Sequence, residues 1–124
     1  MDRYLVVLAG AGLGGVTRYA LSTWIMARSG VRFPLGTFLI NVSGSFLIGL
    51  LMALLSERMS PHPNWRLFLA VGVLGGYTTF SALEYETLQA VRDGDRWMGL
   101  LYMSGSVIFG YLAVWLGSAL VPRR

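Results

Sequence analysis

The sequence predicts an all-α membrane protein with four transmembrane helices in one domain. Three observations predict this fold: the chain has 124 residues, 55% of them are hydrophobic, and only 13% are charged. Soluble domains carry roughly a quarter charged residues, so this chain has too few polar side chains to cover a surface in water. The length allows one domain only. The apolar residues form four runs, each long enough to cross a bilayer, which takes about 20 residues.

Short connections that carry proline and charge separate the four predicted spans. We expect the spans at residues 4–27, 35–56, 67–91 and 98–121. The first contains one charge, Arg18, the second and fourth contain none, and the third contains Glu84 and Glu86. Proline and charge in the connections are typical of helix ends. A signal peptide is the alternative for the first run, but this run continues past its "AGA" sequence, so we expect no cleavage.

The composition excludes several function classes. The chain has no cysteine, so it has no disulfide, thiolate metal site or thiol nucleophile. Its only histidine, His62, lies in a proline-flanked turn, and no paired-carboxylate, Ser/His or metal-ligand set indicates an enzyme. The net charge of +4 comes from arginines alone. Because these arginines lie mostly between apolar runs, they indicate interfacial anchors rather than a nucleic-acid surface.

The arginines also bear on membrane orientation. Four crossings place both termini and the second connection on one side, with five arginines, and the other two connections on the opposite side, with four. An excess of positive charge in short loops normally sets orientation, and this excess is nearly absent. We therefore predict that the chain inserts both ways round and works as an antiparallel dimer. The alternative is one fixed orientation set by other factors.

The glycine-rich start of the first span imitates a dinucleotide-binding motif. Gly10, Gly12 and Gly15 follow the G-x-G-x-x-G pattern. The acid that should bind a ribose about 20 residues later is missing, because no Asp or Glu occurs between Asp2 and Glu57. Close helix packing is the better interpretation, since glycines four residues apart, such as Gly10 and Gly14, let membrane helices touch backbone to backbone.

Polar residues inside the spans predict an ion site. The Gly75-Gly76 pair marks an expected helix break, and a break at membrane depth exposes carbonyls that coordinate cations and a helix N-terminus that favours anions. Hydroxyl and amide side chains accompany it, namely Thr78, Thr79 and Ser81 in the third span, Asn41, Ser43 and Ser45 in the second, and Tyr102 and Ser106 in the fourth. A single Ser or Thr more often bonds its own helix, and Asn41 equally suits helix–helix contact.

Four other residues of the spans have open roles. The ring edge of Phe80 carries partial positive charge and can face a small anion, although Phe80 alone is more often lipid-facing or core. Glu84 and Glu86 can lie near the interface, pair with an arginine or take part in proton transfer. Arg18 can attract anions or bond helix carbonyls, and we favour the structural role.

The motifs "GGVTRY", "GTFLINVSGSFLIG", "GGYTTFS" and "YMSGS", one in each span, resemble the Fluc (CrcB) family of small fluoride channels. The resemblance covers the whole chain. It implies an antiparallel, dual-topology homodimer in the cell membrane, with two pores that export fluoride passively from the cytoplasm and relieve its toxicity. It also implies a structural Na⁺ at the dimer interface, held by backbone carbonyls of the broken third helix at the positions matching Gly75 and Thr78.

The resemblance carries over to individual residues. The family's pore residues match Asn41, Phe80, Ser81, Tyr102 and Ser106, and further family positions match Arg18, Thr79 and Glu86. The chain departs from the usual T-T-F-S-T-F: it reads "TTFSAL", so Ala82 replaces a threonine and Leu83 replaces the second phenylalanine. Leucine offers an anion no aromatic edge, so the second half of an aromatic site is in doubt.

Two other function classes agree less well with the sequence. A small multidrug-type cation exporter also has four helices and dual topology, but that class needs a carboxylate in its first span, where this chain has Arg18. A non-transporting membrane subunit would leave the polar residues of the spans without a role.

Overall fold

The computed structural model describes residues 2–124, and within these residues the chain is helical with no strand. Four helical segments are long and apolar enough to cross a membrane. The first is α1 (Asp2–Ser29), the second α2 (Leu35–Glu57) and the fourth α6 (Arg96–Ala119). The four-helix membrane architecture predicted from the sequence is therefore present, although the last helix ends two residues before the predicted end of its span.

The third segment consists of several pieces. It starts with α3 (Pro63–Arg66) and continues into a π-helical stretch, η1 (Leu67–Leu74), and a short turn, α4 (Gly75–Tyr77). The helix resumes as α5 (Phe80–Arg92). His62 begins the segment as the N-cap, because its Nδ1 accepts a hydrogen bond from the backbone N–H of Asn64 at 3.2 Å.

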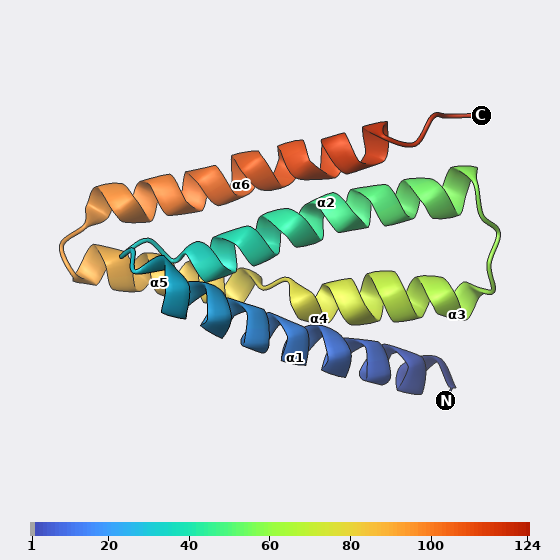
Figure 1. Cartoon of the computed structure of the whole chain (residues 1–124), viewed down its shortest axis with the longest axis horizontal. Coiled ribbons are helices and arrows are strands. Elements are labelled where there is room, and N and C mark those ends of the chain that lie inside the picture. The colour runs from blue at the N-terminus through green and yellow to red at the C-terminus, as the bar shows by residue number, and fades with distance from the viewer. Residues whose placement is uncertain (1) are drawn as a thin grey trace.

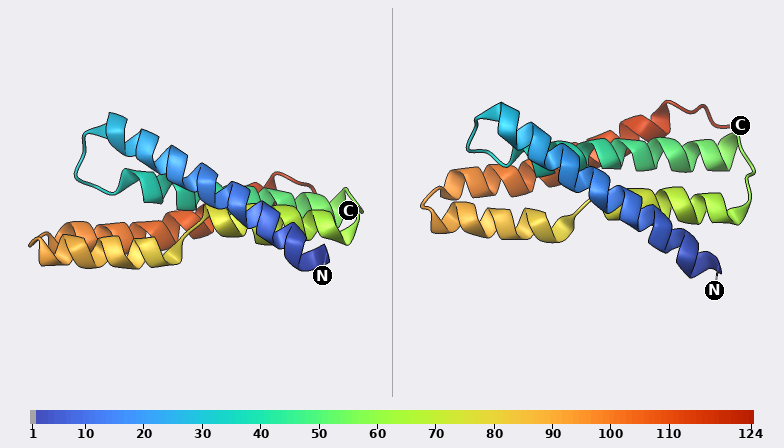
Figure 2. Two further views of the ribbon diagram at one scale, coloured as in Figure 1. Left: turned by 90° about the horizontal axis from the view of Figure 1, so that it is seen from below. Right: turned by 60° about the horizontal axis from the view of Figure 1, so that its bottom comes forward.

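The helices pack in two closely spaced pairs (Figure 1). Glycines bring α2 and α6 together, since a Cβ at Gly49 would collide with the backbone of Val114 and a Cβ at Gly117 with that of Phe46. The α1 helix runs diagonally across the third segment (Figure 2) and contacts η1 and α4. A Cβ at Gly10 would lie 2.9 Å from the Cα of Gly72, so these helices touch through their backbones. The predicted packing role of Gly10 and Gly14 is therefore confirmed, within the chain itself.

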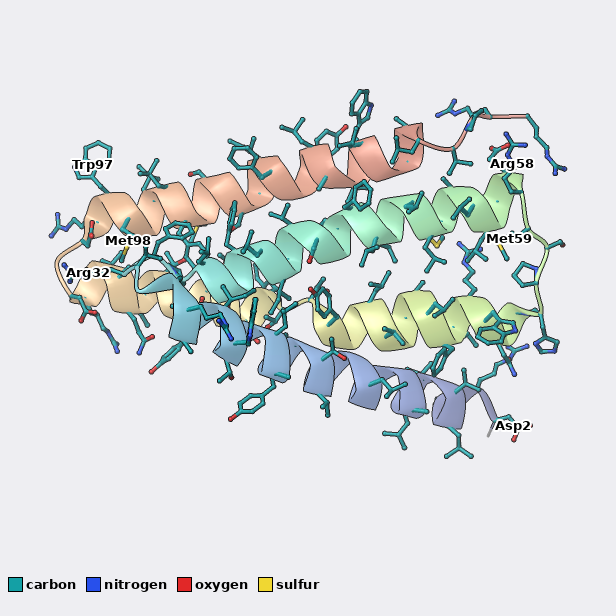
Figure 3. The ribbon with its side chains drawn as sticks, in the orientation of Figure 1. Asp2, Arg32, Arg58, Met59, Trp97 and Met98 are labelled. Atoms are coloured by element: carbon teal, nitrogen blue, oxygen red, sulfur yellow. The ribbon has the colours of Figure 1, made fainter. Side chains whose placement is uncertain are left out.

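The two ends of the bundle carry different residues. Both termini lie at the same end as the connection between α2 and α3 (Figure 1). Arg58 and Asp2 are found there, whereas Arg32 and Trp97 lie at the opposite end (Figure 3). Many large apolar side chains between the ends are exposed, among them Leu8, Val107 and Leu112. Such an apolar outer surface is expected of a protein whose solvent is lipid.

Candidate functional site

The third segment is interrupted at two threonines. Helix α4 ends at Tyr77 and α5 begins at Phe80, while Thr78 (φ −83°, ψ 154°) and Thr79 (φ −148°, ψ 119°) have extended backbones. The break predicted from the sequence at Gly75-Gly76 is at the wrong position, because both glycines are helical. Gly76 serves packing instead, since a Cβ there would lie 2.5 Å from the carbonyl oxygen of Ala11.

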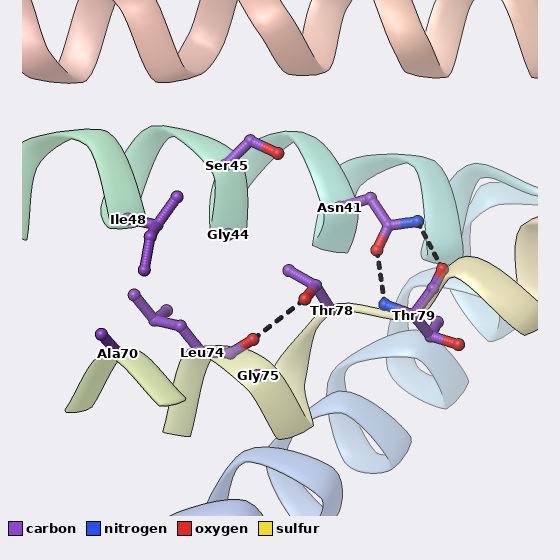
Figure 4. A pocket seen from close by; sticks show the side chains of 9 residues that line it. All are labelled: Asn41, Gly44, Ser45, Ile48, Ala70, Leu74, Gly75, Thr78 and Thr79. Carbon is purple, nitrogen blue, oxygen red and sulfur yellow. Dashed lines mark hydrogen bonds between the residues drawn. The ribbon is translucent and has the colours of Figure 1, made fainter. Parts of the chain in front are cut away.

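Asn41 bonds the exposed backbone of the interruption. Its Oδ1 accepts a hydrogen bond from the Thr79 N–H at 2.8 Å, and its Nδ2 donates to the Thr79 carbonyl at 2.9 Å (Figure 4). The side-chain amide thus replaces the partners that an unbroken helix would supply, which matters because unpaired backbone groups are costly at membrane depth. An amide carries two N–H donors, so one donor of Asn41 remains for another acceptor.

These contacts release the carbonyls of Gly75 and Thr78, among the carbonyls that the interruption frees. In a continuous helix the Thr79 N–H would donate to Gly75 and the Ala82 N–H to Thr78. Here the Thr79 N–H donates to Asn41, and the Ala82 N–H donates to Thr79 Oγ1 at 3.3 Å. The carbonyls of Gly75 and Thr78 therefore lose their helical partners.

A cavity of about 280 Å³ is lined in part by Gly75 and Thr78, the residues of these two carbonyls. Figure 4 shows the side chains that line it, which come from α2 on one side and the third segment on the other: Asn41, Gly44, Ser45, Ile48, Ala70, Leu74, Gly75, Thr78 and Thr79. Carbonyl oxygens beside an open space are suited to a hard cation.

Arg18 bonds the carbonyl end of the first half of the segment. Its Nε donates to the Gly76 carbonyl at 3.2 Å. In a continuous helix that carbonyl would accept from the Phe80 N–H, which the interruption moves away. A guanidinium at the C-terminal end of a helix also favours the helix dipole. This contact is the structural role that the sequence analysis favoured for Arg18.

A second polar group lies between α2, α5 and α6. The Glu86 carboxylate accepts a hydrogen bond from Thr37 Oγ1 at 2.8 Å and another from the Tyr102 hydroxyl at 2.6 Å, one on each oxygen. Within residues 2–124, Glu86 therefore pairs with hydroxyls and with no arginine. Thr37 was not predicted from the sequence, although it lies four residues before Asn41 on the same helix and hence on the same face.

Ser106 continues this group along α6. It lies one turn after Tyr102, which is fully buried, and it is only 7% exposed itself. Its Oγ has no hydrogen-bond partner within residues 2–124. Buried hydroxyls are nearly always paired, so this one offers a donor to a water molecule or a ligand.

The pore residues predicted on α5 do not lie beside the polar group of Glu86, Tyr102 and Ser106. Phe80 is 72% exposed, and Ser81 beside it is exposed as well. Leu83 is 5% exposed, so its side chain is packed inside the chain. One chain therefore does not bring Phe80 and Ser81 next to Tyr102 and Ser106, and Leu83 does not share the outer face of Phe80.

Comparison with known proteins identifies the family. Residues 5–118 match the family described as CrcB-like protein, Camphor Resistance (CrcB). The chain is 57% identical to a fluoride-specific ion channel, FluC, of Solibacter usitatus over 122 residues, which is 98% of this chain and 99% of that protein. Fluoride-specific ion channels of Acidobacterium capsulatum and Thermus thermophilus are 50% and 47% identical, over 98% and 94% of this chain and 97% and 91% of theirs. The chain belongs to the CrcB-like family.

Proposed function

We propose that this protein is a fluoride-selective channel that lets fluoride leave the cytoplasm passively and so relieves its toxicity. The observation that carries the proposal is its 57% identity, over nearly its whole length, to a fluoride-specific ion channel. The chain is a multi-pass protein of the cell membrane, and its four apolar helices are long enough for that role. A channel performs no covalent chemistry, so we assign no catalytic residue.

Hydrogen-bond donors support a small anion as the permeating species. Fluoride is strongly hydrated, and a pore must replace the donors of its water shell. Asn41 retains one N–H after bonding Thr79, and the buried Ser106 hydroxyl has no partner within residues 2–124. Tyr102 and Thr37 already donate to Glu86. In a pore, their hydroxyls would either turn from the carboxylate to the anion or keep the carboxylate out of the path of the anion. Phe80 and Ser81 would line the pore from the outer face of α5.

The working unit we propose is an antiparallel homodimer. Phe80 is 72% exposed although it lies at the interruption, in the middle of the third segment. A second copy in the opposite orientation would place its own interruption beside this one, and would bring Phe80 of one copy toward the polar residues of the other. The nearly even arginine count on the two sides supports both orientations.

A structural Na⁺ at the dimer interface fits the donors available. The released carbonyls of Gly75 and Thr78 are the oxygen ligands that hard cations take. Residues 2–124 contain no cluster of His, Cys, Asp or Glu that could hold a metal, so these carbonyls are the candidate ligands. One chain supplies two of them, and a second copy would double that number. The cation would neutralise the carbonyl dipoles of the two interruptions and hold the copies together.

Ion efflux from liposomes tests the channel. Purified protein is reconstituted with potassium fluoride inside, and external fluoride is read with an electrode after valinomycin is added. We expect rapid release of fluoride and none of chloride in a parallel preparation. Release of both ions would show that the protein does not select fluoride over chloride. Release of neither ion would favour a non-transporting membrane subunit.

Two further measurements test the dimer and the cation. Because the chain has no cysteine, an Arg124→Cys variant can be labelled from each face of the membrane. Labelling from both faces is expected, and labelling from one face contradicts the antiparallel dimer. Protein purified without sodium should release little fluoride and should recover when sodium is added. Equal rates with and without sodium would exclude the structural ion.

A further inference from the structure

Two glutamates of α5 point to opposite sides of the helix. Glu84 and Glu86 are two residues apart, which places their side chains about 200° apart around the helix axis. The Glu86 carboxylate lies inside the chain and accepts the hydroxyls of Thr37 and Tyr102. Glu84 is exposed and accepts no hydrogen bond from residues 2–124. It lies four residues after Phe80 and so shares the outer face of that exposed ring.

Glu84 lies inside the third membrane segment and not in a connection. This segment runs from Pro63 to Arg92, 30 residues or about 45 Å, which exceeds a hydrocarbon core of about 30 Å by about 7 Å at each end. Glu84 precedes Arg92 by eight residues, or about 12 Å along the helix, which places it about 5 Å inside the edge of that core. A carboxylate that faces lipid there is unfavourable, and such groups normally face water or a partner.

Within residues 2–124, no arginine forms an ion pair with Glu84. On α1, Arg18 donates to the Gly76 carbonyl and Arg28 lies over the ring of Trp24. The only acid of α2 is Glu57 at its far end. On α6, Tyr102 donates to Glu86, and Arg96 lies at the helix start beyond the depth of Glu84. The same α5 helix contributes Glu86, turned inward, and Arg92, two turns away.

We propose that Glu84 faces water in the mouth of the ion path and acts as a fixed negative charge that limits how fast anions enter. This inference rests on the proposed fluoride channel. The outer face of α5 then consists of Phe80 and Ser81 at the interruption, where the anion is bound, and Glu84 one turn further toward the membrane surface. An anion that passes about 6 Å from a unit negative charge in water is repelled enough to slow its entry about threefold.

Thiol labelling tests whether water reaches the outer face of α5 at Glu84, and it needs no transport measurement. Glu84→Cys and Leu83→Cys variants of this cysteine-free chain are treated in membranes with a charged, membrane-impermeant methanethiosulfonate, and the added mass is followed with time. Leu83 is the matched control because it is the adjacent residue and is buried. We expect rapid labelling at position 84 and little at 83. A rate at position 84 no higher than at 83 means that lipid or the second copy covers Glu84, and overturns the inference.

Fluoride efflux tests the charge. Glu84→Gln should release fluoride about threefold faster than the wild type at about 10 mM ionic strength, where screening is weak. The gain should disappear near 1 M, and Glu84→Asp, which keeps the charge, should behave as the wild type. Asp93→Asn, which removes an exposed acid beyond the end of α5, is the control and should leave the rate unchanged. An unchanged or lower rate in Glu84→Gln overturns the inference. If the wild type releases no fluoride while position 84 is still labelled, the channel is refuted, but the conclusion that Glu84 faces water holds.

Discussion

The two halves of the interrupted third segment are held in place by different means. The first half, η1 and α4, contains no charged residue and lies against α1 with glycines at the contact. The second half, α5, contains two glutamates and packs on α6, and its side chains of Leu83, Thr87 and Ala90 are buried. Backbone proximity positions the first half, whereas side-chain packing and hydrogen bonds position the second.

The difference explains where the polar groups gather. Thr78 and Thr79 let the two halves lie against different neighbours, so the chain exposes its backbone where the two kinds of packing meet. Arg18 from α1 and Asn41 from α2 bond that backbone. Among the other freed carbonyls, those of Gly75 and Thr78 belong to residues that line the cavity, and they are the candidate cation ligands.

The largest expected effect comes from separating the first half from α1. In Gly14→Ala the new Cβ would collide with the carbonyl oxygen of Val73 and lie 2.8 Å from the Tyr77 nitrogen. These are backbone atoms that cannot move aside, so we expect the free energy of unfolding to fall by about 3 kcal/mol or more. Thermal unfolding in detergent, followed by tryptophan fluorescence, measures the change.

Gly12→Ala is the control for this substitution. No atom lies within 4 Å of a Cβ at Gly12, and alanine in a helix is favoured over glycine by about 1 kcal/mol. The control should therefore be as stable as the wild type or slightly more stable. Equal losses at both positions would mean that close backbone contact does not place the first half.

The second-largest loss of stability is expected when the hydrogen bonds at the interruption are removed. Asn41→Leu keeps a similar volume but leaves the N–H and the carbonyl of Thr79 unpaired, which should lower stability by about 3 kcal/mol and abolish fluoride release. Hydrogen exchange at the Thr79 amide should become faster. Ser45→Ala, one turn away on the same cavity wall, should leave both stability and this exchange rate unchanged. Slow exchange in Asn41→Leu would show that another group holds the interruption.

A smaller effect is expected from the hydroxyls that hold the second half. Thr37→Val removes one of the two donors to Glu86, and a hydrogen bond to a charged group contributes about 2 kcal/mol. Thr87→Val is the matched control, because Thr87 is equally buried but bonds the carbonyl of Leu83 in its own helix at 2.7 Å. The control should lose less stability in thermal unfolding. If the two variants lose the same amount, the Glu86 contacts do not place α5.

The smallest effect on stability is expected at Leu83, and together with Phe80 it tests which of the two side chains lines the ion path. Leu83 is buried, so the larger ring of Leu83→Phe should lower stability by about 1 kcal/mol and leave the rate of fluoride efflux unchanged. Phe80→Leu, at the exposed position, should instead slow efflux with little change in stability. A faster channel in Leu83→Phe would place that side chain in the ion path.

Only part of the site was predictable. Asn41 was singled out because an amide is rare in an apolar span, and Arg18 because it is the only cation within one of the predicted spans; both bond the backbone of the third segment. The interruption was placed three residues too early. Its position depends on where Asn41, 38 residues earlier, and Arg18, 58 residues before Gly76, meet the freed backbone groups. Local helix propensity carries no information about such distant partners.

The sequence by itself determined that this protein has four apolar helices and that the first one packs through Gly10 and Gly14, because span length and glycine spacing are local properties. Tertiary structure alone decided that the helix opens at Thr78 and Thr79, that Glu86 turns inward to Thr37 and Tyr102, and that Leu83 is buried while Glu84 is exposed. The physical reason is that a freed carbonyl or a carboxylate in a membrane is stable only where a donor reaches it, and those donors come from other helices.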